Sequence, residues 1–231
     1  METRLYRLIL LKCVPFIRFT TYYTSLRGNK YHEGYRLLRP GCILLTVDRR
    51  KLTSVLIPGT MSHAALCVFK RPPHDALMGV DAYEVAEMTH ENYTRSDFFD
   101  ICKEADRVVI LQCLDWDDDY VARVIDACLG FKDAKYDVEF ELGVKSLYCS
   151  ELVYEADKTA DYWARGGDDA TFDTDQKYGR LQVDLSDVAG LGRPYISPDG
   201  LLFAKNVRCV WDSDGFWQGL MGPQIEERIC R

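Results

Sequence analysis

One cysteine of the chain stands where a thiol can become reactive. Cys149 opens a segment, residues 149–163, whose apolar residues recur at the spacing of one helical face. Free backbone N–H groups at a helix N-terminus, and the positive end of the helix dipole, stabilise a thiolate. A nucleophilic cysteine needs the lowered thiol pKa that results, whereas a buried structural cysteine at a helix start would give the same pattern. Cys149 is therefore a candidate nucleophile.

A thiol nucleophile also needs a base, and one of the four histidines is placed differently from the others. His63 lies inside an apolar, strand-like run, residues 62–69, and is followed by Ala64 and Ala65. A polar ring within a core strand must find a hydrogen-bond partner, and small neighbours let another element pack close to it. The other histidines fall in predicted loops or at the ends of elements: His32, His74 and His90. His63 is thus the candidate base, with a hydrogen-bonded core histidine as the alternative.

A base is usually oriented by a third polar group, and two glutamates compete for that position. Glu84 and Glu87 lie on the next strand-like segment, residues 82–88. Their side chains point to opposite faces because strand side chains alternate. Either one is equally explained as a solvated side chain, so the residues alone leave the choice open.

Tyr148 stands directly before the candidate nucleophile. Its hydroxyl is a candidate to donate a hydrogen bond to an oxyanion or to the substrate, and the alternative is a packing aromatic ring. The backbone N–H of Cys149, at the helix N-terminus, is the natural first donor to an oxyanion.

The elements that must position these residues form a mixed pattern. Strands are predicted over residues 42–47, 62–69, 82–88, 106–113 and 201–211. Helices are predicted over residues 96–103 (capped by Ser96 or Asp97), 117–130 and 149–163. Residues 70–80 and 165–180 are predicted as loops, and residues 136–147 as a loop or hairpin. This pattern predicts an α+β fold in which helices pack on a small antiparallel sheet.

Composition narrows the class of protein. A chain of 231 residues with an apolar fraction of 47% predicts one folded domain. The net charge of −7 argues against a broad nucleic-acid-binding face, which has to be basic, so we expect no nucleic-acid partner. The nine cysteines include no CxxC or CxxH pair, which predicts neither a zinc knuckle nor a disulfide scaffold and favours the cytoplasm or another reducing compartment. We expect no metal and no cofactor.

The basic N-terminal region contains one apolar run that needs a targeting check. Residues 8–17 are interrupted by Lys12 and Pro15, are too short to span a membrane and lack a small-residue cleavage site. No segment reaches about 18 consecutive apolar residues. We therefore expect a protein that is neither secreted nor membrane-spanning, and a weak surface attachment through this arm stays open.

Four segments, in their order along the chain, resemble the circularly permuted NlpC/P60 group of papain-like enzymes, often called YiiX-like. They are PGCILL at residues 40–45, IPG with SHAAL within residues 57–66, YD followed by YCSELVY within residues 136–154, and SPDGL at residues 197–201. In the first of them Cys42 stands where the family usually has Asp. The resemblance covers roughly residues 39–211, which leaves residues 1–38 as an N-terminal extension and residues 212–231 as a C-terminal tail.

The resemblance implies a papain-like core in which the histidine precedes the cysteine, with Cys149 as nucleophile and His63 as base. The third residue in such proteins is often a Glu in a V-x-E-A pattern. Val85-Ala86-Glu87 fits this pattern once residues 70–80 are treated as an insertion, with Met88 in place of Ala. Glu87 is therefore the preferred third residue, and Glu84 stays its competitor.

Three functions are compatible with this resemblance. The first is an amidase or peptidase that cleaves a peptide or peptidoglycan-like amide through a thioester acyl-enzyme. The second is a lipid acyltransferase or phospholipase on the same core, which would favour an exposed apolar segment near the site. The third is a non-catalytic structural protein, which the presence of both Cys149 and His63 argues against. A phage or viral source would make the virion an alternative location.

Overall fold

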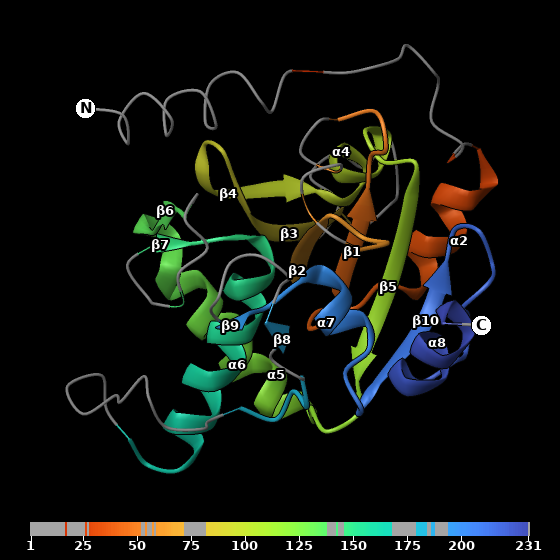
Figure 1. Cartoon of the computed structure of the whole chain (residues 1–231). Coiled ribbons are helices and arrows are strands. Elements are labelled where there is room, and N and C mark those ends of the chain that lie inside the picture. Colours follow the sequence, from red (N-terminus) through yellow and green to blue (C-terminus); the bar gives the residue numbers. More distant parts are fainter. Residues whose placement is uncertain are drawn as a thin grey trace.

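A six-stranded sheet flanked by helices forms the centre of the molecule (Figure 1), seen in a computed structural model. The structure describes residues 17, 26, 28–51, 54, 57, 59–71, 82–137, 142, 146–167, 179–183, 186–187 and 194–230. The strands of the sheet are β1 (Ile43–Val47), β2 (His63–Arg71), β3 (Ala82–Thr89), β4 (Asn92–Asp97), β5 (Arg107–Cys113) and β10 (Val207–Asp212).

The strands lie in the order β10-β5-β1-β2-β3-β4, and all neighbours in the sheet are antiparallel. Two further two-stranded pairs lie outside it: β6 (Lys135–Tyr136) with β7 (Ser146–Leu147), and β8 (Ser186–Asp187) with β9 (Pro194–Tyr195). The predicted α+β class with an antiparallel sheet is confirmed.

Helices cover both faces of the sheet. The described helices are α2 (Asn29–Leu37), α4 (Phe98–Lys103), α5 (Asp118–Gly130), the 3-10 turn η2 (Phe131–Asp133), α6 (Cys149–Ala164), α7 (Pro198–Leu202) and α8 (Gly222–Ile229). Ile43 and Leu45 of β1 point into the core shared with α5, α6 and α7, whereas Leu44 points into the core shared with α2 and α4. Because side chains alternate along a strand, β1 contributes to both cores at once.

Helices α5 and α6 pack against the core that contains Ile43 and Leu45. Near the start of each helix a carboxylate accepts a hydrogen bond from a backbone N–H group. The Asp117 carboxylate accepts a hydrogen bond from the Tyr120 N–H and caps α5. At α6 the Glu151 carboxylate accepts from the Tyr148 N–H at 3.3 Å. The start of α6, and with it Cys149, is thereby fixed in place.

The sequence-based prediction missed strand β4. Residues 96–103 were expected to be one helix, but Ser96 and Asp97 are the last residues of β4 and α4 begins at Phe98. Asp97 caps that helix by accepting from the Phe99 N–H at 2.8 Å. The hairpin between β3 and β4 turns at Asn92, whose φ of +80° is the left-handed conformation that Asn tolerates.

Three further boundaries differ from the expected ones. The strand expected over residues 201–211 begins at Val207, because Ser197 caps a helix that already contains Leu201 and Leu202. The loop expected over residues 70–80 begins later, since β2 runs to Arg71, and residues 72–81 lie outside the described residues. For residues 136–147, expected as a loop or hairpin, the hairpin alternative is wrong because β6 and β7 pair in parallel, and residues 138–141 and 143–145 lie outside the described residues.

Both predicted flanking regions contribute to the cores. Leu26, Tyr35 and Leu38, from the expected extension, are buried in the core next to α4. Trp217 and Ile225, from the expected tail, are buried in the core next to α6. The boundaries at residues 38 and 212 stay a prediction, as does the loop over residues 165–180, most of which lies outside the described residues.

Candidate active site

Cys149 is the first residue of α6, as expected, and only 4% of it is exposed. The backbone N–H groups of Ala64 and Ser150 point to its sulfur. The Ser150 hydroxyl donates to the Ile196 carbonyl at 2.6 Å and so ties the first turn of α6 to the segment after β9. The thiol therefore has the helix N-terminus and two backbone donors around it, which all favour a thiolate.

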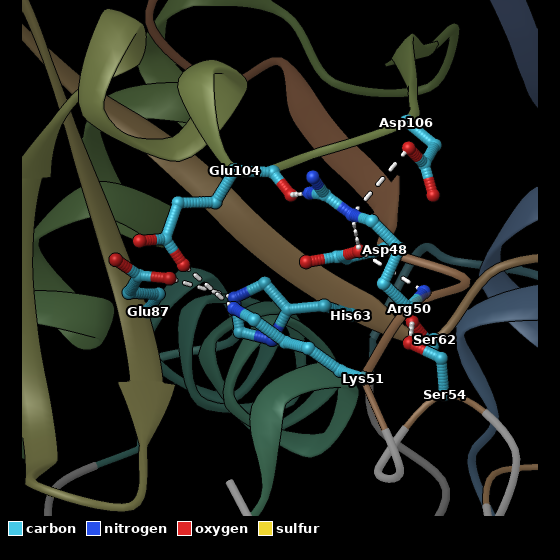
Figure 2. Close-up of polar contacts among 9 residues, drawn as sticks. All are labelled: Asp48, Arg50, Lys51, Ser54, Ser62, His63, Glu87, Glu104 and Asp106. Carbon is cyan, nitrogen blue, oxygen red and sulfur yellow. Dashed lines mark hydrogen bonds and ion pairs between the residues drawn. The ribbon is translucent and has the colours of Figure 1, made fainter. Parts of the chain in front are cut away.

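His63, the first residue of β2, lies between the thiol and a carboxylate. Its Nε2 is 2.7 Å from Oε2 of Glu87, and its side chain is 25% exposed. Figure 2 shows the ring facing the Glu87 carboxylate. The ring also forms a hydrogen bond with the Cys149 side chain. Because Nε2 is taken by Glu87, Nδ1 is the ring nitrogen available to the thiol. The structure thus brings the nucleophile, base and third residue of the sequence prediction together.

Strand register decides which of the two glutamates reaches the histidine. Glu87 of β3 lies directly opposite Ala65 of β2, so it is a diagonal neighbour of His63 on the same face. Glu84 points to the other face and forms an ion pair with Arg95 of β4. The alternation that the sequence predicts for the two glutamates is therefore present, and it leaves only Glu87 on the histidine.

The Glu87 carboxylate has a second partner that sequence reasoning missed. Its Oε1 accepts a short hydrogen bond, 2.5 Å, from the hydroxyl of Ser96 on β4. Ser96 pairs with Val85 across the two strands. Val85 lies two residues before Glu87 on β3, so Ser96 and Glu87 share one face of the sheet. With both oxygens engaged and 9% of its side chain exposed, Glu87 is held in one orientation toward His63.

Charges in the site stabilise one another. Burial opposes the imidazolium, but the hydrogen bonds and charges of Cys149 and Glu87 outweigh it and raise the pKa of His63 to about 10. Burial likewise opposes the thiolate, but the hydrogen bond and charge of His63 bring the pKa of Cys149 below its ordinary value. The pKa of Glu87 is also lowered, because His63, Ser96 and the charge of Lys51 outweigh its burial. At neutral pH these directions favour a thiolate–imidazolium pair with an ionised Glu87.

Tyr148 is placed beside the nucleophile, but its hydroxyl is used in the core. The side chain is fully buried, its ring stacks on Tyr195 with centroids 5.1 Å apart, and its oxygen accepts from the Ile196 N–H at 2.9 Å. Burial raises the pKa of Tyr148, so the phenol stays neutral. Its predicted role as a donor to an oxyanion or substrate stays a prediction.

Another tyrosine, Tyr136 at the end of β6, was not singled out as a site residue. Burial and the nearby charge of Cys149 raise its pKa, which keeps the phenol protonated beside the thiolate. It belongs to the YD pair of the segment used for the family resemblance, so a signal for it was present in the sequence.

Asp199 holds the segment that leads into β2. Its carboxylate accepts from the backbone N–H groups of Thr60 and Met61, both at 2.8 Å, and from the Thr60 hydroxyl at 3.0 Å. Gly59 lies against this carboxylate with a φ of +124°, and a Cβ there would come within 2.6 Å of the Asp199 oxygen. This arrangement fixes the backbone just before His63.

The comparisons with known proteins agree with this geometry. A family model described as permuted papain-like amidase enzymes, YaeF/YiiX, C92 family, matches residues 37–162, more than half of the chain and both His63 and Cys149. The chain belongs to this family. The predicted resemblance to YiiX-like papain-like enzymes is confirmed, and membership in an amidase family supports a hydrolase type of function.

A solved protein structure has a similar fold. The crystal structure of the metalloprotein yiiX from Escherichia coli O157:H7 superposes with a TM-score of 0.52 at 15% sequence identity, covering 75% of this chain and 96% of that one. No curated protein sequence matches this chain. In the part of this amidase-family chain that the structure describes, no group of three or more His, Cys, Asp or Glu side chains is arranged to hold a metal ion. Among the same residues, no helix has the length and apolar character needed to cross a membrane.

Proposed function

We propose that the protein is a cysteine hydrolase that cleaves an amide bond through a thioester formed on Cys149. The observation that carries the proposal is the continuous chain of contacts from Cys149 through His63 to Glu87. It provides a nucleophile, a base and a group that orients the base, which together make a thiol competent for acyl transfer.

In the proposed reaction the Cys149 thiolate attacks the carbonyl carbon of the substrate. The carbon–sulfur bond forms as the carbonyl π electrons move to oxygen and give a tetrahedral oxyanion. When the oxyanion collapses, the carbon–nitrogen bond breaks and the His63 imidazolium gives its proton to the leaving amine. His63 then takes a proton from water, whose oxygen attacks the thioester. Cys149 leaves as thiolate, and the released product is a carboxylic acid.

Two donors are available for the oxyanion. The first backbone N–H groups of a helix have no partner within that helix, so the N–H of Cys149 is the primary donor in the proposal. The neutral Tyr136 phenol is the second, since it lies close enough to the thiol for the charge of Cys149 to raise its pKa. The Tyr148 hydroxyl is a weaker choice because the whole side chain is buried, with its ring stacked on Tyr195.

A peptide or peptidoglycan-like amide is the proposed substrate class. Membership in a family of amidases supports this class. The lipid alternative would need an exposed apolar segment near the site, for which the N-terminal arm is the candidate, and residues 1–16 of that arm lie outside the described residues. We also propose the cytoplasm or another reducing compartment as the place of action, because the eight described cysteines are all free and a thiolate nucleophile must stay reduced.

The test is the rate at which Cys149 reacts with iodoacetamide between about pH 4 and about pH 9, followed by peptide mass spectrometry. Cys230 is free and exposed, so it serves as an ordinary thiol within the same molecule. Below about pH 7 we expect Cys149 to react roughly tenfold or more faster than Cys230, and His63→Ala to remove this advantage. His90→Ala is the matched control, because His90 contacts Glu91 and lies outside the site.

Either of two results would remove the basis of the proposal. One is a Cys149 that reacts no faster than Cys230 below about pH 7. The other is a fast-reacting Cys149 whose rate His63→Ala leaves unchanged. If the thiol passes this test, incubation with peptide amides should give a thioester adduct on Cys149 in the intact mass, and Cys149→Ser should abolish both the adduct and the hydrolysis.

A further inference from the structure

A lysine from outside the triad reaches the site from the turn that follows β1. Nζ of Lys51 is 2.7 Å from Oε2 of Glu104, which follows α4. Figure 2 shows the Lys51 side chain extending toward the Glu104 and Glu87 carboxylates, beside the His63 ring. The charge of Lys51 adds a contribution smaller than those of His63 and Ser96 to the lowered pKa of Glu87.

The turn that carries Lys51 is fixed to the rest of the protein. Nε of Arg50 binds Oδ1 of Asp48 at 2.6 Å, and its NH2 group donates to the Glu104 carbonyl at 2.9 Å. The Arg49 N–H donates to Oδ2 of Asp106 at 2.8 Å, so the turn is bound to both ends of the connection between α4 and β5. Lys51 is 27% exposed, and its position is held by backbone and side-chain contacts at once. An ordered cation next to a reacting ion pair shifts the equilibria of that pair.

We propose that Lys51 and Glu104 form a charge pair that sets the pH range in which Cys149 and His63 exist as thiolate and imidazolium. Lys51 is in this view a positioning residue, which acts through Glu87 and His63 and does not touch the substrate. The inference rests on the proposed cysteine chemistry and adds to it a means by which the site is adjusted.

The charges around the site determine in which direction the loss of the Lys51 or the Glu104 charge should shift the pKa values of Cys149 and His63. The groups around the pair come from several elements: Lys51 after β1, His63 on β2, Glu87 on β3, Ser96 on β4, Glu104 after α4 and Cys149 on α6. Two phenols, Tyr136 on β6 and Tyr195 on β9, also lie near the thiol, and burial and the charge of Cys149 raise their pKa, so they stay neutral. A nearby cation favours every loss of a proton, both from the thiol at the acid limit and from the imidazolium at the alkaline limit. A nearby anion disfavours both. The Arg50 charge is compensated within its own cluster by Asp48 and Asp106.

The experiment measures the alkylation rate of Cys149 by iodoacetamide against pH, at low ionic strength, and fits the acid and alkaline midpoints. Lys51→Met should move both midpoints up by about 0.5 to 1 pH unit, and Glu104→Gln should move both down by a similar amount. Lys51→Arg keeps the charge and should restore the wild-type midpoints. Lys103→Met is the matched control, because Lys103 pairs with the exposed Asp100.

A merely structural role of Lys51 would not shift the pH midpoints in opposite directions in Lys51→Met and Glu104→Gln. If Lys51 only stabilised the turn, its removal would lower the melting temperature or the amount of active protein and leave the midpoints in place. Midpoints that stay unchanged, or that move in the same direction in Lys51→Met and Glu104→Gln, would overturn the inference while Cys149 remains fast-reacting. A Cys149 that is slow in the wild type would instead contradict the proposed function itself.

Discussion

Replacing Glu87 by Gln tests the origin of the imidazolium in this site. The substitution keeps the size of the side chain, and its amide oxygen can still accept from Nε2 of His63, but the negative charge is removed. In the structure that charge lies 2.7 Å from Nε2 and 9% of the Glu87 side chain is exposed. The main effect should therefore be electrostatic, with little change in packing.

The size of the expected change in the pKa of His63 follows from its distance to the Glu87 charge and from partial screening by solvent. An opposite charge in direct contact shifts a pKa by about 1 to 3 units. Because a quarter of the His63 side chain is exposed, we expect the lower part of that range, about 1 to 2 units. The pKa of His63, about 10 in the wild type, should thus fall to about 8 to 9 in Glu87→Gln. The thiolate–imidazolium pair exists below the pKa of His63 and is lost above it. A lower pKa in the variant should therefore move the alkaline limit of Cys149 reactivity to lower pH.

Alkylation of Cys149 between about pH 6 and about pH 11 gives the measurement. Glu84→Gln is the matched control, since Glu84 lies three residues away on the same strand but faces Arg95. It should leave the alkaline midpoint in place. The reasoning would be refuted if Glu87→Gln left that midpoint within about 0.3 units of the wild type, or if Glu84→Gln moved it as far.

Two further substitutions separate the support of the site from its chemistry. Asp199→Ala removes the acceptor of the Thr60 and Met61 N–H groups, so we expect a loss of about 1 to 3 kcal/mol in the free energy of unfolding, measured in urea, together with slower alkylation of Cys149; an unchanged urea midpoint would contradict the role of this carboxylate. Tyr136→Phe should lower kcat roughly tenfold or more on an amide substrate while the alkylation rate of Cys149 stays the same. Equal losses in both assays would show that Tyr136 supports the thiol and not the oxyanion.

The site residues whose secondary structure follows from their neighbours in the chain were predictable from the sequence. Cys149 lies at the start of a helix, and the first turn of a helix creates the environment that a thiolate needs wherever the helix packs. His63 lies in an apolar run that predicts a core strand, and it is the first residue of β2. In both cases a few neighbouring residues determine the conformation, whereas the pKa values of the two side chains depend mainly on their contact with each other.

The contacts that orient the histidine depend on strand pairing, which the sequence does not state. Alternation separated Glu84 from Glu87, but only the pairing of Glu87 with Ala65 decides which of them meets His63. The same holds more strongly for Ser96. Its strand, β4, reads NYTRSD and has no apolar alternation, because an edge strand with half-buried residues does not require one. A local pattern therefore favoured a helix from Ser96, and the hydrogen bond to Glu87 could not be foreseen.

In the proposed arrangement the two residues that set the pH range of the site lie outside the segments that carry the family resemblance. Lys51 and Glu104 are 53 positions apart and meet through the turn after β1 and the end of α4. Lys51 forms its hydrogen bond with Glu104, whereas His63 forms its own with Glu87 and Cys149, so we expect a change of charge at position 51 or 104 to alter the protonation of the site with little change in its geometry. We infer that the contact of His63 with Glu87 depends on the pairing of β2 with β3, whereas the pH range of the site depends on a separate long-range ion pair.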